Sequence, residues 1–320
     1  MRYYVGVGMY KVRYALLVLM VFWVSACEGS TALTAVAPSP KKATSTPHQD
    51  TAQIATLPPT EVLTSTPRPT LAADEWKSLP IVPAVSDTVI EIYRHGLELG
   101  NDPNAFSKVG DCQTSTDFFL VDFDHAGYYR LGEYADLQAT IDYYQGSFSR
   151  KSMAVKDGYN VAAVLSPLRA DPEICEQGET PLACEIRLNH PSVILISMET
   201  NFNLQTAAKY GGYMRQIVEY SISQGVVPIL ATKADNKEGD NSINAEIAAI
   251  ANEYDIPLWN FWAAVQPLPN TGFDTGLNDG FHLSFSQNFF DQPKNMLSAW
   301  PWRNLTALQT LDAVRNGLNK

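Results

Sequence analysis

The sequence predicts an α/β fold for residues 81–320: a three-layer α/β/α sandwich around a mostly parallel sheet. Two observations predict it. Short, continuous apolar runs such as Val193–Ile196 are typical of strands that are buried on both faces. Longer stretches with apolar residues at helical spacing separate these runs. This alternation favours right-handed crossovers that return the chain to parallel strands.

The helices are predicted from apolar residues that recur every three or four positions. The stretches with this pattern are 86–99, 206–224, 243–251 and 307–318. In 206–224 the apolar face is formed by Tyr210, Tyr213, Met214 and Ile217. Gly225 follows directly, and glycine is a common helix stop.

The strands are predicted at the apolar runs between these helices, which are 105–109, 193–196, 226–230 and 256–261. In parallel sheets ligands bind at the carboxyl ends of the strands. Three segments fall there, namely Gly110-Asp111-Cys112, Met198–Asn201 and Ala231-Thr232-Lys233. We therefore expect the functional residues among them.

Residues 1–26 have the features of a signal peptide. Lys11 and Arg13 precede a 12-residue apolar run, Ala15–Ala26, which is too short to span a bilayer. Small residues before Cys27 resemble the lipobox of bacterial lipoproteins. The resemblance implies cleavage before Cys27, acylation of its thiol and a membrane anchor. The alternative is an uncleaved signal anchor with an incidental cysteine.

Residues 27–75 are rich in Thr, Pro and Ser. Such a segment lacks the apolar residues needed to offset its ordering entropy, so we expect a disordered, extended tether. With the anchor, this predicts an exported lipoprotein held at the cell surface or on the periplasmic face of a membrane. A disordered tail without a spacing role has the same composition.

Composition excludes several classes of protein. The 320 residues carry a net charge of -11, which repels phosphate backbones and argues against a nucleic-acid partner. No apolar run after residue 30 is long enough for a membrane span, which argues against a polytopic membrane protein. We expect a monomer that needs no cofactor and no metal.

The chain has four cysteines. If Cys27 carries lipid, three remain. Cys175 and Cys184 lie nine residues apart and could close a small loop by a disulfide in an oxidising compartment. That pairing would leave Cys112 as a thiol.

Four segments in order along the folded region resemble the sequence blocks of the SGNH, or GDSL-type, hydrolases. These are Gly110-Asp111-Cys112, Lys156-Asp157-Gly158-Tyr159, Thr200-Asn201 and Asp279-Gly280-Phe281-His282. The resemblance covers the whole folded region and implies a flavodoxin-like arrangement of the sheet. It also implies hydrolysis of an ester, such as an acyl group on a glycan or a lipid.

The resemblance implies a role for each matching residue. Cys112 would be the nucleophile, His282 its general base and Asp279 the carboxylate that orients the imidazole. The backbone N–H groups of Cys112 and Gly158 and the side-chain amide of Asn201 would bind the oxyanion. We expect helices to begin at Cys112 and near Gly158, the first of which would add its dipole to the oxyanion site.

The sequence departs from the family pattern at two blocks. Cysteine replaces the usual serine at position 112, and a free thiol has a pKa of about 8.5, so attack near neutral pH requires a lowered pKa. Glu199 stands where a glycine is usual and could bring a negative charge toward the oxyanion. A catalytically degenerate module that binds acylated or carbohydrate ligands is therefore the alternative, and a fold kept only for interaction is a third.

Each site residue also has a structural interpretation. Cys112 could be a small buried hydrophobic residue, His282 an exposed loop histidine, Asp279 a turn former and Asn201 a helix cap. Four tryptophans could form a sugar-stacking platform, although core packing is the favoured interpretation: Trp259, Trp262, Trp300 and Trp302.

Overall fold

The computed structural model describes residues 69–115, 117–198, 206–277 and 279–318. The predicted α/β class is confirmed: a four-stranded parallel sheet has the order β1-β2-β3-β4. Its strands are β1 Asp102–Gly110, β2 Pro191–Ser197, β3 Val227–Ala231 and β4 Leu258–Trp259. β2 and β3 are buried along their whole length, as expected for strands covered on both faces.

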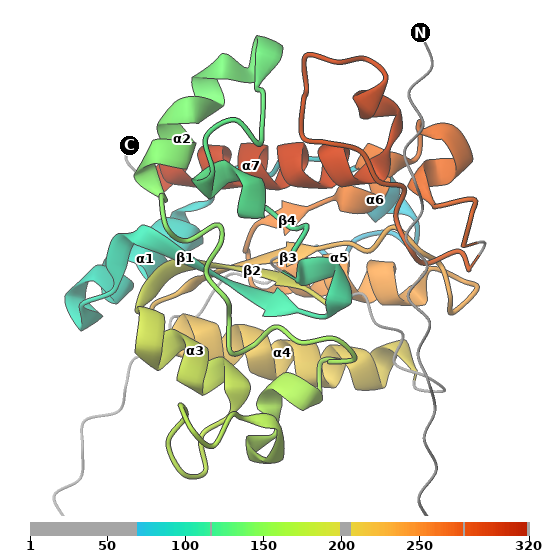
Figure 1. Ribbon diagram of the computed structural model, residues 1–320. Helices are drawn as coiled ribbons and strands as arrows, with labels where there is room; N and C mark the ends of the chain where they lie inside the picture. Colours follow the sequence, from blue (N-terminus) through green and yellow to red (C-terminus); the bar gives the residue numbers. More distant parts are fainter. Residues whose placement is uncertain (1–68, 116, 199–205, 278, 319–320) are drawn as a thin grey trace, which may run out of the picture. The chain divides into compact units, whose positions relative to one another are not determined.

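Helices cover both faces of this sheet (Figure 1). The three crossover helices α3, α4 and α5 lie on one face, which is the arrangement that right-handed crossovers between sequential strands require. The terminal helices α1 and α7 pack together on the other face, with α2 and α6 beside α7. Their bounds are α1 Asp87–Leu99, α2 Gln138–Tyr143, α3 Pro181–Asn189, α4 Ala207–Ser223, α5 Ser242–Glu253, α6 Phe261–Val265 and α7 Ala299–Leu318.

Local signals set the ends of these helices. The hydroxyl of Ser86 accepts a hydrogen bond from the backbone N–H of Val89 and caps α1. Thr206 caps α4 in the same way through the N–H of Lys209. The predicted helices at 86–99 and 206–224 are therefore confirmed nearly to the residue.

The register of the sheet aligns the carboxyl ends of the strands. Gly110 pairs with Ser197, and Ala231 pairs with Trp259. The residues that follow β1, β2, β3 and β4 thus emerge together at the carboxyl end of the sheet. The candidate site lies at this end.

The edge of the sheet beside β1 is reduced to a single bridge. A flavodoxin-like sheet places a further strand next to its first strand. Here Val155 forms one parallel bridge with Gly110. Lys156 donates its backbone N–H to the Gly110 carbonyl at 3.3 Å. The segment therefore occupies that position without forming a full strand.

The helix expected near Gly158 is absent from the described segment around it, so that prediction is wrong. Gly158 lies in a turn with φ +78°, a left-handed conformation that suits glycine and ends helices. The fourth strand is also shorter than the predicted 256–261. The side chain of Asn260 accepts from the N–H of Ala263 and begins α6, which ends the strand at Trp259.

The folded unit includes residues before the predicted start at 81. Leu71 packs against the core, and Trp76 is 2% exposed. Asn260 donates its side-chain amide to the carbonyls of Trp76 and Leu79 at 2.9 and 3.0 Å. None of the helices in the described part of the chain combines the length and hydropathy of a membrane span.

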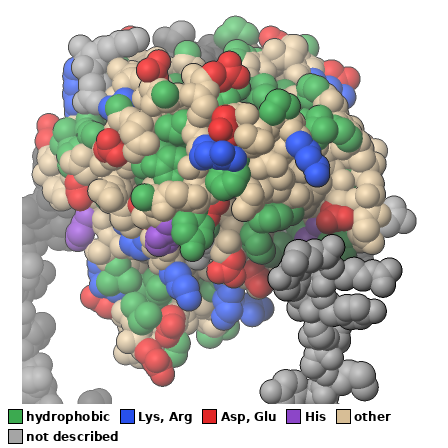
Figure 2. All heavy atoms as spheres, turned by 45° about the horizontal axis from the view of Figure 1, so that its top comes forward, with side chains coloured by type: hydrophobic (Ala, Val, Ile, Leu, Met, Phe, Trp, Pro, Cys, Tyr) green, Lys and Arg blue, Asp and Glu red, His purple; other side chains and the backbone are tan. Residues whose placement is uncertain are grey.

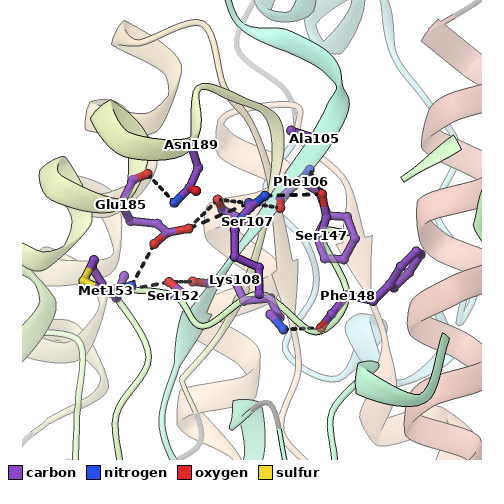
Figure 3. A network of polar contacts seen from close by, with 12 residues as sticks. Ala105, Phe106, Ser107, Lys108, Ser147, Phe148, Ser152, Met153, Glu185 and Asn189 are labelled. Carbon is purple, nitrogen blue, oxygen red and sulfur yellow. Dashed lines mark hydrogen bonds and ion pairs between the residues drawn. The ribbon is translucent and has the colours of Figure 1, made fainter. Parts of the chain in front are cut away.

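A polar network crosses β1 inside the fold (Figure 3). The Glu185 carboxylate on α3 accepts hydrogen bonds from the Ser107 hydroxyl at 2.6 Å and the Met153 backbone N–H at 2.7 Å. The Lys108 ammonium donates to the Phe148 carbonyl at 2.7 Å. The buried carboxylate and the buried ammonium thus each have hydrogen-bond partners.

Candidate active site

The turn after β1 holds Cys112 at the carboxyl end of the sheet. Gly110 allows this turn, because a Cβ atom there would lie 2.1 Å from the Thr114 Oγ1 and 2.5 Å from the Ser197 carbonyl. The buried Asp111 carboxylate accepts from the backbone N–H of Gln113 at 2.9 Å. Cys112 retains its thiol and is partly exposed.

Cys112 begins a single turn of 3-10 helix, Cys112–Thr114, and not the longer helix that the sequence led us to expect. The C-terminal end of that turn is followed by extended backbone at Ser115. A three-residue turn sums few peptide dipoles, so its field at the thiol is weaker than that of a full helix. The prediction that a full helix adds its dipole to the oxyanion site is therefore wrong.

Asp279 and His282 form a preassembled pair. One oxygen of the Asp279 carboxylate accepts from the backbone N–H groups of Phe281 and His282, each at 3.0 Å. The other oxygen lies 2.5 Å from the His282 Nδ1. The hydrogen bond from the backbone N–H of His282 is the main reason why the pKa of the Asp279 carboxyl lies well below its usual range, and the bond to the His282 ring is the second. The carboxylate thus fixes the ring and leaves Nε2 as the available nitrogen.

Gln113 joins the two loops, although they are far apart in the sequence. Its side-chain amide donates to the Phe281 carbonyl at 2.8 Å, one residue before His282. The side chain is buried, with 2% of the residue exposed. Sequence reasoning missed Gln113, because nothing local indicates a contact across 168 positions.

Arg303 of α7 supports the same turn from beneath. Its fully buried guanidinium donates to the Gln113 carbonyl at 3.1 Å and to the Ser197 Oγ at 2.9 Å. It also lies over the Phe119 ring, 4.7 Å from the ring centroid. Sequence reasoning missed Arg303 as well, since an arginine on a C-terminal helix usually faces solvent.

A loop after β3 contacts the Asp279 loop from the other side. The Lys237 ammonium donates to the Asp279 backbone carbonyl at 2.9 Å. In the same loop the buried Lys233 pairs with Asp235 at 2.8 Å and with Glu238. Residues that follow β3 therefore belong to this site region, as their place at the edge of the sheet predicts.

Cys112 and His282 line one cavity of about 330 Å³. Its other walls are mostly apolar or acidic side chains from the same edge of the sheet: Gln113, Ser115, Asp117, Phe118, Asp157, Leu277, Leu283, Phe285 and Trp300. Of the four tryptophans, Trp300 lines this cavity, while Trp259 is fully buried against Arg303.

The expected oxyanion residues are not all placed in this cavity. The cavity is lined by Asp157, and Gly158 is not among its lining residues. Asn201 and Glu199 lie outside the described residues, as does Cys27. Within the part of the chain that the structure describes, Cys112 is the one member of the predicted oxyanion set that lines the cavity.

Cys175 and Cys184 are joined by a disulfide that ties the preceding loop to α3. Glu179 lies with these two sulfurs in a group that is spaced closely enough to hold a metal. Because the sulfurs are bonded to each other, they cannot act as thiolate ligands. The disulfide is therefore a structural link.

Comparisons with known proteins give only distant similarities. No family model and no curated protein sequence match the chain. Among solved structures, the chain is similar to a GDSL-like lipase from Bacteroides thetaiotaomicron, with 15% identity, a TM-score of 0.39 and coverage of 70% of this chain and 98% of the other. It is similar to TesA, with 18% identity, a TM-score of 0.41 and coverage of 66% and 99%. An acetyl xylan esterase has 13% identity, a TM-score of 0.39 and coverage of 64% and 96%.

Proposed function

We propose that this chain is an ester hydrolase of the SGNH type in which cysteine replaces the serine nucleophile. One observation carries the proposal: Cys112 and His282 line the same cavity, and His282 is already bonded to Asp279. The sequence blocks around these residues resemble that family. A nucleophile, a base and an orienting carboxylate in this order support acyl transfer.

The residues of the site would act in two steps. His282 Nε2 takes the Cys112 proton, and the thiolate attacks the ester carbonyl carbon. The ester C–O bond breaks, and the alcohol leaves with the proton from His282, which leaves an acyl thioester on Cys112. Water then attacks this thioester with His282 as base, and the carboxylic acid and the thiol are released.

The second candidate function is a binding module without turnover. Asp157 lines the cavity beside Cys112, and a carboxylate near the developing oxyanion opposes the reaction. The single 3-10 turn after β1 offers little compensating dipole. Such a module would bind an acylated glycan or a similar ester and leave it intact.

Hydrolysis of a short aryl ester such as 4-nitrophenyl acetate by the full chain tests the proposal. We expect His282→Ala, Asp279→Asn and Cys112→Ala to lower kcat/KM by about a thousandfold, because each removes one member of a unit that acts together. Since the pKa of the Asp279 carboxyl is held below its usual range, Asp279 stays ionised throughout the assay range. The acid limb of the wild-type pH profile therefore belongs to another group.

The matched control is His95→Ala, which removes an exposed histidine on α1 and should leave the rate unchanged. Equal rates for wild type and His282→Ala would contradict the assignment. An inert wild type that gains esterase activity on Cys112→Ser would identify a degenerate enzyme.

We also propose that the protein is exported and anchored by lipid at Cys27. The signal-like residues 1–26 and the small residues before Cys27 support this proposal. The Cys175–Cys184 disulfide is a second support, because disulfides persist in oxidising compartments outside the cytoplasm.

A further inference from the structure

The charged groups that line the Cys112 cavity are acidic. Asp117 and Asp157 are exposed side chains on its wall. Among the described lining residues none is lysine or arginine. Behind His282 lie the Asp279 carboxylate and the Lys237 ammonium, which donates to the Asp279 carbonyl, and neither lines the cavity. A bound group with negative charge would be repelled here, and a positive one attracted.

The same cavity holds a buried hydrogen-bond acceptor. The side-chain amide nitrogen of Gln113 donates to the Phe281 carbonyl, and the Oε1 oxygen of the same amide is buried. Within the described part of the chain, this buried oxygen has no hydrogen-bond partner. Leaving a buried acceptor unsatisfied costs free energy, so Gln113 adds an under-satisfied polar group to the wall of the cavity.

Aromatic side chains form the apolar wall of the cavity. Phe118 and Phe285 are 48% and 61% exposed, and their ring centroids lie 5.7 Å apart. Phe118 also packs against Trp300 at 5.6 Å. Exposed aromatic faces near carboxylates attract cations that carry apolar groups.

We propose that the cavity selects esters whose alcohol portion carries a protonated amine and rejects esters with an anionic alcohol portion. This inference rests on the proposed function for the identity of the reacting group, but it concerns the charge of the pocket. The carboxylates of Asp117 and Asp157 balance the charge of the ammonium group, and the aromatic rings contact its carbon atoms.

The charge of the pocket can be measured without turnover by modifying Cys112. Methanethiosulfonate reagents react with a thiolate to form a mixed disulfide and release methanesulfinate. The full chain is treated with the trimethylammonium reagent and with the sulfonate reagent, and mass spectrometry follows the peptide that contains Cys112. Relative to the uncharged thiol 2-mercaptoethanol, we expect the ratio of the rate with the cationic reagent to the rate with the anionic reagent to be at least about fivefold higher.

Asp117→Asn combined with Asp157→Asn should bring this ratio close to that of 2-mercaptoethanol. The matched control is Glu91→Gln with Glu98→Gln, which changes the net charge equally. Both residues lie on α1. Glu98 is in its last turn, which leads to the start of β1, at the end of the sheet opposite to the cavity. The control should keep the wild-type ratio. A wild-type ratio equal to that of 2-mercaptoethanol, or an equal effect of both double variants, would overturn the inference.

Three acetates of nearly equal shape test selection during turnover: 2-(dimethylamino)ethyl acetate, 3-methylbutyl acetate and 3-acetoxypropanoate. We expect kcat/KM to fall in that order, from cation to neutral ester to anion. Hydrolysis of all three at equal rates would overturn the inference and leave the hydrolase proposal standing. Hydrolysis of none would overturn the hydrolase proposal, and the thiol-modification ratio would still decide the charge of the pocket.

Discussion

At the scale of single residues, the Asp279–His282 pair is a local structure. An aspartate whose carboxylate accepts from the N–H groups two and three residues later forms a tight turn, and this turn returns the histidine ring to the same carboxylate. The sequence therefore contains enough information to predict the pair. The contact between this pair and the Cys112 turn is different, because it depends on Gln113.

We predict that Gln113→Met lowers kcat by roughly tenfold to a hundredfold and changes KM much less. The substitution keeps the size of the side chain but removes the donor to the Phe281 carbonyl, so His282 loses its fixed position relative to Cys112. Ester hydrolysis over a range of substrate concentrations gives the two constants separately.

The control for this prediction is Gln216→Met, an exposed glutamine on α4 whose replacement should leave both constants unchanged. A Gln113→Met enzyme with wild-type kcat would show that the bond to Phe281 does not position the histidine. A loss that follows only from unfolding would appear as a matching drop in Tm.

At the scale of secondary-structure elements, β1 carries a buried charge that the proposed reaction does not use. Lys108 is 1% exposed, and burial, with the nearby Arg150, lowers the pKa of its ammonium to about 7. An unfolded lysine has a pKa of about 10.4. Between these two values the unfolded chain binds a proton that the folded chain does not, so the free energy of unfolding rises with pH.

We predict that the wild type gains about 2 kcal/mol of unfolding free energy between pH 7 and pH 9 relative to Lys108→Met. Urea unfolding at the two pH values measures this difference. Lys151→Met, which replaces an exposed lysine nearby, should retain the wild-type pH dependence. Parallel pH profiles for wild type and Lys108→Met would show that the Lys108 ammonium keeps its ordinary pKa in the fold.

The elements also show where sequence patterns are sufficient. Helices α1 and α4 were predictable because capping residues and apolar spacing are local signals. The segment at 156–159 was not, because its conformation is set by pairing with Gly110 across the edge of the sheet. The local sequence of the segment gives no signal of that pairing.

At the scale of the whole molecule, Cys27 provides a test of export that does not depend on catalysis. When the full chain is expressed in a bacterium that acylates lipoproteins, we expect the wild type to enter the detergent phase on Triton X-114 partitioning. Cys27→Ser should lose this behaviour, since it removes the acylated thiol.

The matched control is Cys112→Ser, which removes a cysteine that is not part of the disulfide and should still enter the detergent phase. Equal partitioning of wild type and Cys27→Ser would contradict the anchor. If both proteins enter the detergent phase, the apolar residues 15–26 would be the part of the chain that attaches it to the membrane.

By itself the sequence determined the α/β class, the four strands, the helices α1, α4, α5 and most of α7, and the local loop that pairs Asp279 with His282. These features depend on apolar periodicity, caps and turns, which act between near neighbours in the chain. Only the tertiary structure decided that Cys112 and His282 share a cavity, that Gln113 and Arg303 hold the turn, and that Asp157 in place of Gly158 lines the wall. Those contacts join residues that are far apart in the chain, and parallel strand register brings them together.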